Sequence, residues 1–149
     1  MNVVFWKNRE KGEIDPLLFS KTADELAQKL AKENEESRQK LNKRTQLRKF
    51  YDEVIRLENA SMERRPEFGT VLLENVARER NSEWTTVLPM VHMLTAKAAY
   101  ARGRGLISDS FLTFIKESVS QTQTINDLRV FSSFFEAVIG FYTQYEPKK

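Results

Sequence analysis

Apolar residues along the chain recur mainly at three- and four-residue steps, the spacing of one face of an α-helix. The clearest such stripe lies near the end of the chain, where Thr124 and Asp127 are placed as a capping box. Its members are Leu128, Phe131, Phe134, Phe135, Val138, Ile139, Phe141, Tyr142 and Tyr145. We expect this helix to pack on the core. The stripe is wide, and burying both Phe134 and Phe135 is expected to require a second copy or a neighbouring subunit, because large exposed apolar patches usually mark interfaces.

Five earlier stretches show the same spacing and are also predicted to be helices. They cover about residues 17–30, 44–65 (closed by Arg64-Arg-Pro66), 68–80, 82–102 and 109–121. Ser82 is the expected N-cap of the fourth stretch, and Ser108 or Asp109 that of the fifth. Pro89 should kink the fourth helix or move its start to about that residue, because proline lacks the backbone N–H that a helix interior uses.

Two segments lack this spacing. Val3 to Trp6 form a short apolar patch that fits an edge strand, a docking segment or a flap over the core. Residues 31–43 are almost wholly polar, as in a solvated helix end or a linker. We therefore predict an all-α fold, a compact bundle of about five to six helices over residues 41–149. A long, partly polar N-terminal extension with one helix, over residues 1–40, precedes it.

The composition agrees with one globular domain. A chain of 149 residues has the usual size of a single domain, and 40% of its residues are hydrophobic. It has no cysteine, which excludes disulfides and cysteine-ligated zinc and favours a reducing, cytoplasmic compartment. Charged residues interrupt the N-terminal segment, so no signal peptide is expected, and no run is long enough to span a bilayer.

The chain offers little catalytic chemistry. His92 is the only histidine, with no histidine or acidic residue three or four positions further on. A lone imidazole supplies neither the ligand set of zinc nor a nucleophile and base pair, so we expect a packed or surface histidine. No phosphate-binding loop, dinucleotide-binding glycine pattern or paired-carboxylate motif is present, and Gly103-Arg-Gly105 is expected to end a helix. We therefore expect no enzyme activity, no catalytic residue, no metal and no cofactor.

The positive charge is clustered. The formal net charge of +3 does not by itself indicate nucleic acid. Residues 37–51 nevertheless carry six basic residues and no acidic one, and a second acid-free group lies between residues 97 and 104. From these groups we predict six RNA-binding residues: Arg44, Arg48, Lys49, Lys97, Arg102 and Arg104.

The spacing of the second group suits a phosphate backbone. Lys97, Tyr100 and Arg104 lie at i, i+3 and i+7, one helical stripe about 10 Å long. Arginine binds phosphate oxygens and tyrosine stacks on unpaired bases, both without strong sequence preference. The competing interpretation is a solvated cationic helix end, which the helix dipole favours. The first group lies near the start of its helix, where the dipole disfavours cations, and this favours a functional reason for it.

Three motifs occur in order along the chain. Residues Thr45 to Tyr51 fit Thr-x-Leu/Ile-Arg-Lys-Phe-Tyr at the opening of a helix, and Lys97 to Arg104 fit Lys-x-x-Tyr-Ala-x-x-Arg at the end of a later one. Phe131 to Ala137 fit Phe-x-x-Phe-Phe-Glu-Ala in the last helix. Together, over about Leu41 to Tyr145, they resemble the small subunit of the type III-A (Csm) CRISPR interference complex. The chain departs from that family in its long segment before residue 41 and in Gly140, where alanine is expected.

The resemblance implies an all-helical subunit without catalytic activity, stacked in copies beside the guide-bearing backbone subunits, which cradles guide and target RNA. Its motifs place Arg48, Lys49, Lys97 and Arg104 on phosphates, whereas Arg44 and Arg102 rest on charge and position alone. Tyr51, Tyr100 and the phenylalanines are implied to be packing residues. The patch from Val3 to Trp6 is a candidate contact with a neighbouring subunit.

Two functions remain open. In the first, the chain is a non-enzymatic RNA-binding subunit in antiviral defence, whose partners are guide RNA, target RNA, other subunits of the complex and further copies of itself. In the second, it is a helical protein-interaction scaffold whose basic patches meet acidic partner surfaces. A helix-turn-helix DNA reader fits less well, because no short glycine-bearing turn joins two compact helices.

Overall fold

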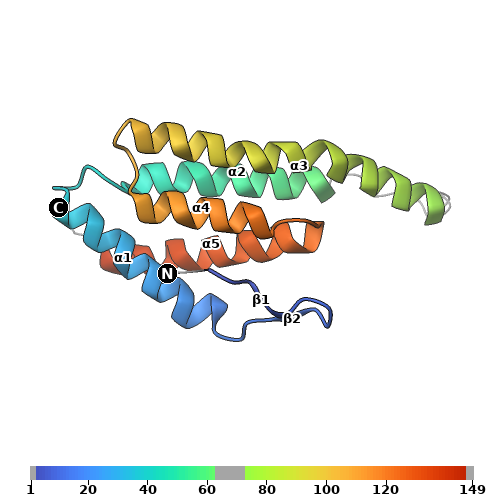
Figure 1. Ribbon diagram of the computed structural model, residues 1–149, viewed down its shortest axis with the longest axis horizontal. Coiled ribbons are helices and arrows are strands. Elements are labelled where there is room, and N and C mark those ends of the chain that lie inside the picture. The colour runs from blue at the N-terminus through green and yellow to red at the C-terminus, as the bar shows by residue number, and fades with distance from the viewer. Residues whose placement is uncertain (1–2, 63–72, 147–149) are drawn as a thin grey trace.

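Helices dominate the fold, as predicted. The computed structural model describes residues 3–62 and 73–146, and side chains within 3–61 and 84–146. Within these residues a hairpin of β1 (Trp6–Asn8) and β2 (Glu13–Ile14) precedes a π-helical turn, η1 (Leu18–Thr22). Five α-helices follow: α1 (Ala23–Glu36), α2 (Arg44–Met62), α3 (Leu73–Gly103), α4 (Asp109–Gln121) and α5 (Ile125–Tyr145). In Figure 1, α2 to α5 run along one another as a bundle and α1 crosses it obliquely, packed on α5.

The longest helix, α3, differs from the prediction. It continues through Ser82, so the predicted N-cap at Ser82 is wrong. A serine within a helix costs only a few tenths of a kcal/mol, about 0.5 relative to alanine, and that is too little to break a helix held by packing. Pro89 also lies inside α3, which starts well before it (Figure 1). Two predictions fall outside the described residues. They are the first part of the third predicted helix, from Phe68 to residue 72, and the end of the second predicted helix at Arg64-Arg-Pro66.

The last two helices begin where the sequence predicts. The side chain of Ser108 accepts a hydrogen bond from the backbone N–H of Phe111 and caps α4. Thr124 and Asp127 form the capping box of α5, because each side chain accepts a hydrogen bond from the other residue's backbone N–H. Both caps satisfy backbone donors that the first turn of a helix leaves unpaired.

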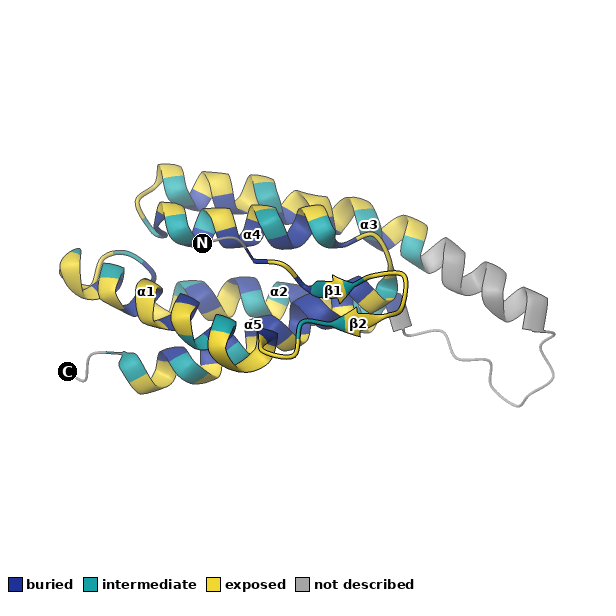
Figure 2. Cartoon of the chain, turned by 60° about the horizontal axis from the view of Figure 1, so that its bottom comes forward, coloured by how far each residue is buried: buried dark blue, intermediate teal, exposed yellow. Residues whose placement is uncertain are grey.

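Most of the wide apolar stripe of α5 is buried within a single chain, and only Phe141 and Tyr145 of its members are partly exposed (Figure 2). Phe134 and Phe135 are both fully buried, so the expectation that they need a second copy is wrong. Phe134 packs against Phe5 of the N-terminal segment, with 6.3 Å between ring centroids. Phe135 packs edge-on against Phe114 and Tyr51, with centroid distances of 5.1 and 5.5 Å. The core thus uses a segment that lies far from α5 in the sequence.

The N-terminal segment is both a flap over the core and the start of a strand. Val3 and Phe5 are buried, and β1 begins at Trp6. Two side chains of α4 hold its backbone: Glu117 accepts from the N–H of Val3 (2.6 Å), and Gln121 accepts from the N–H of Phe5 (2.8 Å). The interpretation as a docking segment is therefore wrong for Val3 and Phe5, which bury their side chains in their own chain.

The polar run of residues 31–43 is not wholly solvated. It forms the end of α1 and a loop, but Asn34 and Asn42 within it are buried. Asn42 adopts a left-handed backbone conformation (φ 58°), which asparagine tolerates better than most residues. Its side-chain oxygen accepts from the N–H of Ser108 (2.9 Å), and its backbone carbonyl accepts from the hydroxyl of Tyr142 (2.6 Å). Burial, with Glu146 nearby, raises the pKa of Tyr142 to about 12.

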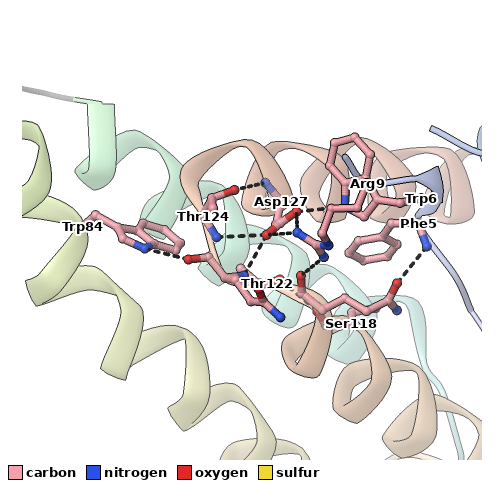
Figure 3. A network of polar contacts seen from close by, with 10 residues as sticks. Phe5, Trp6, Arg9, Trp84, Ser118, Thr122, Thr124 and Asp127 are labelled. Atoms are coloured by element: carbon pink, nitrogen blue, oxygen red, sulfur yellow. Dashed lines mark hydrogen bonds and ion pairs between the residues drawn. The ribbon is translucent and has the colours of Figure 1, made fainter. Parts of the chain in front are cut away.

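A second polar cluster joins the hairpin to the start of α5 (Figure 3). We call Asp127, Arg9, Trp6 and Thr124 the Asp127 cluster. The buried carboxylate of Asp127 accepts hydrogen bonds from the guanidinium of Arg9 (2.8 and 2.9 Å) and from the indole N–H of Trp6 (2.8 Å). It also accepts from the backbone N–H groups of residues 123 and 124. Burial alone raises the pKa of Asp127, but these donors outweigh it and hold the pKa below its usual value.

Candidate nucleic-acid interface

A groove of about 530 Å³ lies between α2 and α3. We call it the α2–α3 groove. Three predicted RNA-binding residues, Lys49, Lys97 and Arg104, line it and are exposed. The other lining residues are Gln46, Phe50, Glu53, Met93, Leu94, Ala96, Tyr100, Ala101 and Leu106. The groove therefore combines a mostly apolar surface with exposed cations, which suits a ligand that has both apolar and anionic parts.

The turn that ends α3 positions Arg104, which lines this groove. The N–H of Leu106 donates to the carbonyl of Ala101, and that of Gly105 donates to Arg102 (3.0 Å each). This is the Schellman arrangement, and Gly105 supplies its left-handed residue with φ +72°. The prediction that the glycine-rich turn ends a helix is thereby confirmed for Gly105.

Tyr100 and Arg104 form a pair on the exposed surface of the groove. The ring of Tyr100 is 67% exposed, so the implied packing role of this tyrosine is wrong. The Arg104 guanidinium lies 5.7 Å from the ring centroid and donates to the Tyr100 hydroxyl (3.2 Å). A cation–π contact at an exposed site contributes about 0.5–1 kcal/mol. An exposed ring beside a guanidinium is the arrangement in which proteins stack unpaired bases and hold the adjoining phosphate.

One carboxylate, that of Glu53 on α2, lies among these cations. Lys97 Nζ is 3.6 Å from Glu53 Oε1, and Arg56, one turn further along α2, forms two hydrogen bonds to the same carboxylate. We call Glu53, Arg56 and Lys97 the Glu53 cluster. The hydrogen bond from Arg56 lowers the pKa of Glu53, partial burial opposes this, and the charge of Lys97 lowers it further. Glu53 is therefore ionised at neutral pH and reduces the positive potential of the groove.

The three other predicted site residues do not line the groove. Arg44 Nη1 lies 3.5 Å from Glu146 at the end of α5, and Arg102 forms an ion pair with Asp109 at the start of α4. Arg48 is exposed on α2 and lies near Tyr51. Burial raises the pKa of Tyr51, and the charge of Arg48 opposes this with a smaller effect. The six cations thus divide between the groove and neighbouring faces of the bundle.

The structure also restricts the helix-dipole argument. Because α2 begins at Arg44, only Arg44 lies within the first turn, where the dipole acts. Its ion pair with Glu146 gives that residue a structural partner. The dipole gives no reason to expect a function for Arg48 or Lys49, so the prediction of RNA binding rests on exposure for Arg48, and on exposure and the groove for Lys49. Tyr51 is half-buried and packs on Phe135, which confirms its predicted packing role.

Sequence reasoning did not identify Glu53, Phe50 or Met93 as parts of this site. The apolar periodicity of α2 marks Phe50 as a core residue, and it is indeed buried at the base of the groove. Nothing in the sequence distinguishes Met93, which is 47% exposed, from the buried apolar residues of its helix, or Glu53 from other acidic residues. Only the packing of α2 on α3 brings residues 46–53 beside residues 93–106.

Two further properties hold for the described residues. None of the helices there is long and apolar enough to cross a membrane. No group of three or more histidine or acidic residues in that part of the chain is placed to hold a metal ion. His92 is exposed, as one of the two predicted alternatives has it.

The fold and the groove define a small all-α protein with a partly apolar, partly basic interhelical groove. A family model described as Csm2 Type III-A matches residues 18–148. The chain therefore belongs to the Csm2 family of type III-A systems and is a small subunit of the Csm effector complex, as its three motifs predict. The match begins at η1, so it includes α1, which the motifs do not reach. No curated protein and no solved structure matches the chain.

Proposed function

We propose that this subunit is non-catalytic and binds the backbone of guide and target RNA in the cytoplasm, mainly through the α2–α3 groove, as part of antiviral defence. Copies of it stack along the complex beside the other subunits. The family supports membership in a type III-A effector complex. RNA binding and stacking are our additions to that statement.

The observation that carries the proposal is the convergence of three cations on one groove. Lys49 on α2, Lys97 on α3 and Arg104, which directly follows α3, come from two of the three motifs, yet they line the same surface. Tyr100 lies between Lys97 and Arg104 in the sequence and is the most exposed large apolar side chain among the described residues. Arg48, next to Lys49 in the sequence, is also exposed on α2.

The contacts available favour binding that is nearly blind to sequence. Lysine and arginine bind phosphates, and a tyrosine ring stacks on any base. Affinity should fall with rising salt, because each bound phosphate releases condensed counterions. Weak binding by one copy is sufficient when stacked copies bind a single strand, since linked sites raise the overall affinity.

The test is a titration of a labelled, unstructured RNA of about 30 nucleotides, followed by fluorescence anisotropy at low and moderate salt. The variant is Lys97→Ala/Arg104→Ala. Its matched control is Lys32→Ala/Lys116→Ala, which removes the same charge from exposed positions on α1 and α4. We expect the groove variant to lose about tenfold in affinity and the control to lose about twofold or less.

Equal losses in the groove variant and its control would contradict the assignment of the site. A complete lack of RNA binding by the unmodified chain would favour the second candidate function, a helical scaffold. The apolar lining of the groove, with Met93 and Phe50, is the observation that favours that alternative, because it also suits a partner helix.

A further inference from the structure

The Glu53 cluster contains a carboxylate at the place where our proposed function puts a phosphate. Glu53 lines the α2–α3 groove together with Lys49, Lys97 and Arg104. Its side chain is 23% exposed, and it lies 3.6 Å from the ammonium group of Lys97. An anionic ligand that approaches Lys97 therefore meets the Glu53 carboxylate, which already forms an ion pair with Lys97.

The geometry allows Lys97 to leave this contact at little cost. Arg56 donates two hydrogen bonds to the Glu53 carboxylate, from Nε and Nη2. Glu53 therefore keeps a bidentate cationic partner when Lys97 moves to another anion. Lys97 is itself 46% exposed on a flexible side chain, so it can reorient without a change in the fold.

We propose that Glu53 competes with RNA phosphate for Lys97 and thereby sets the affinity of the groove. In the free subunit, Lys97 is bound to Glu53. When RNA binds, Lys97 exchanges the carboxylate for a phosphate oxygen, and Glu53 stays bound to Arg56. This inference rests on the proposed function, since it presupposes that the ligand is a nucleic-acid backbone.

The expected effect is moderate. Exposed ion pairs shift equilibria by factors of about one to five, and removal of the negative charge also ends its repulsion of the phosphate. We therefore expect Glu53→Gln to raise RNA affinity about threefold or more at low salt. The gain comes from the loss of a competitor, since Glu53 itself does not bind RNA in this proposal. The gain should shrink as salt screens both terms.

The experiment compares four full-length proteins in the same anisotropy titration: the unmodified chain, Glu53→Gln, Lys97→Ala, and the double variant Glu53→Gln/Lys97→Ala. The matched control for a lost negative charge is Glu25→Gln, at an exposed position on α1, which packs on α5 rather than on α2 or α3. Circular dichroism and the thermal midpoint of each variant establish that the fold is retained.

Support requires two results together. Glu53→Gln must bind RNA more tightly than Glu25→Gln, and its gain must fall below about twofold when Lys97 is absent. If the unmodified chain binds through the groove but Glu53→Gln gains no more than Glu25→Gln, the inference is overturned while the proposed function stands. If the gain is the same without Lys97, competition for Lys97 is overturned. If neither the unmodified chain nor Glu53→Gln binds RNA at any salt, the proposed function and this inference both fail.

Discussion

The Asp127 cluster and the Glu53 cluster use the same chemistry in opposite settings. In both, a carboxylate accepts hydrogen bonds from an arginine. The Asp127 side chain is 1% exposed, whereas that of Glu53 is 23% exposed. Asp127 also accepts from an indole and two backbone N–H groups, so that with Arg9 its donors lie on two segments of the chain, the hairpin and the link between α4 and α5. The partners of Glu53 are the exposed ends of Arg56 and Lys97.

The difference separates a structural ion pair from an exchangeable one. A buried carboxylate that loses a donor becomes an unsatisfied acceptor, and removal of the carboxylate leaves its donors without an acceptor. An exposed pair contributes little to stability, so its lysine remains available to another anion. We therefore expect changes in the Asp127 cluster to alter folding, and changes in the Glu53 cluster to alter binding.

Asp127→Ala should have the largest effect on the free energy of unfolding. It removes the N3 carboxylate of the α5 capping box and leaves the Trp6 indole and backbone donors without an acceptor. We expect a loss of about 2–4 kcal/mol, measured by urea denaturation. A loss below about 0.5 kcal/mol would contradict the structural role of the cluster.

Arg9→Ala should destabilise the fold less, by about 1 kcal/mol. Its side chain is 41% exposed, so part of its interaction with Asp127 is screened by water. Asp127 keeps its other donors in this variant. A loss as large as that of Asp127→Ala in the same denaturation assay would mean that the ion pair, rather than the cap, dominates the cluster.

Acid should remove the contribution that the charged Asp127 carboxylate makes to stability. Because the pKa of Asp127 is lowered in the folded state, its contribution to stability is present above the unfolded pKa of about 3.9 and is lost as the pH falls through the folded pKa. The difference in unfolding free energy between the unmodified chain and Asp127→Asn should therefore narrow below about pH 4. A difference that stays constant from pH 7 to pH 2.5 would contradict the lowered pKa.

Glu53→Gln and Lys97→Ala should have the smallest effects on folding. Both side chains line the groove and are partly exposed, so each change is expected to alter the free energy of unfolding by about 0.5 kcal/mol or less. Urea denaturation of both variants beside Asp127→Ala gives the comparison directly. A loss of about 2 kcal/mol in either would place the Glu53 cluster in the same structural class as the Asp127 cluster.

The sequence predicts the local parts of this fold and few of the long-range ones. The caps at Ser108 and Thr124 and the stripe of α5 are visible because their signals lie within one helical turn or one face. Ser82 gives the same signal as Ser108 but lies inside α3, where tertiary packing decides. The covering of Phe134 by Phe5 joins residues more than a hundred positions apart, and no periodicity reveals it.

The candidate site shows the same limit. Motif and charge mark Lys49, Lys97 and Arg104 separately, but only the packing of α2 on α3 shows that they share a groove. Arg102 has the same charge as Arg104 and lies in the same acid-free group, although the motif includes only Arg104. It is bound to Asp109 because the turn after α3 returns the chain beside it.

The most direct test is photochemical cross-linking of RNA that carries 4-thiouridine to the subunit within the assembled complex, with the linked peptides identified by mass spectrometry. If the α2–α3 groove binds the RNA, cross-links should concentrate in residues 46–53 and 93–106, Tyr100 among them. Cross-links confined to the hairpin, α1 or α4, or none in this subunit while its neighbours are labelled, would contradict RNA binding at the groove.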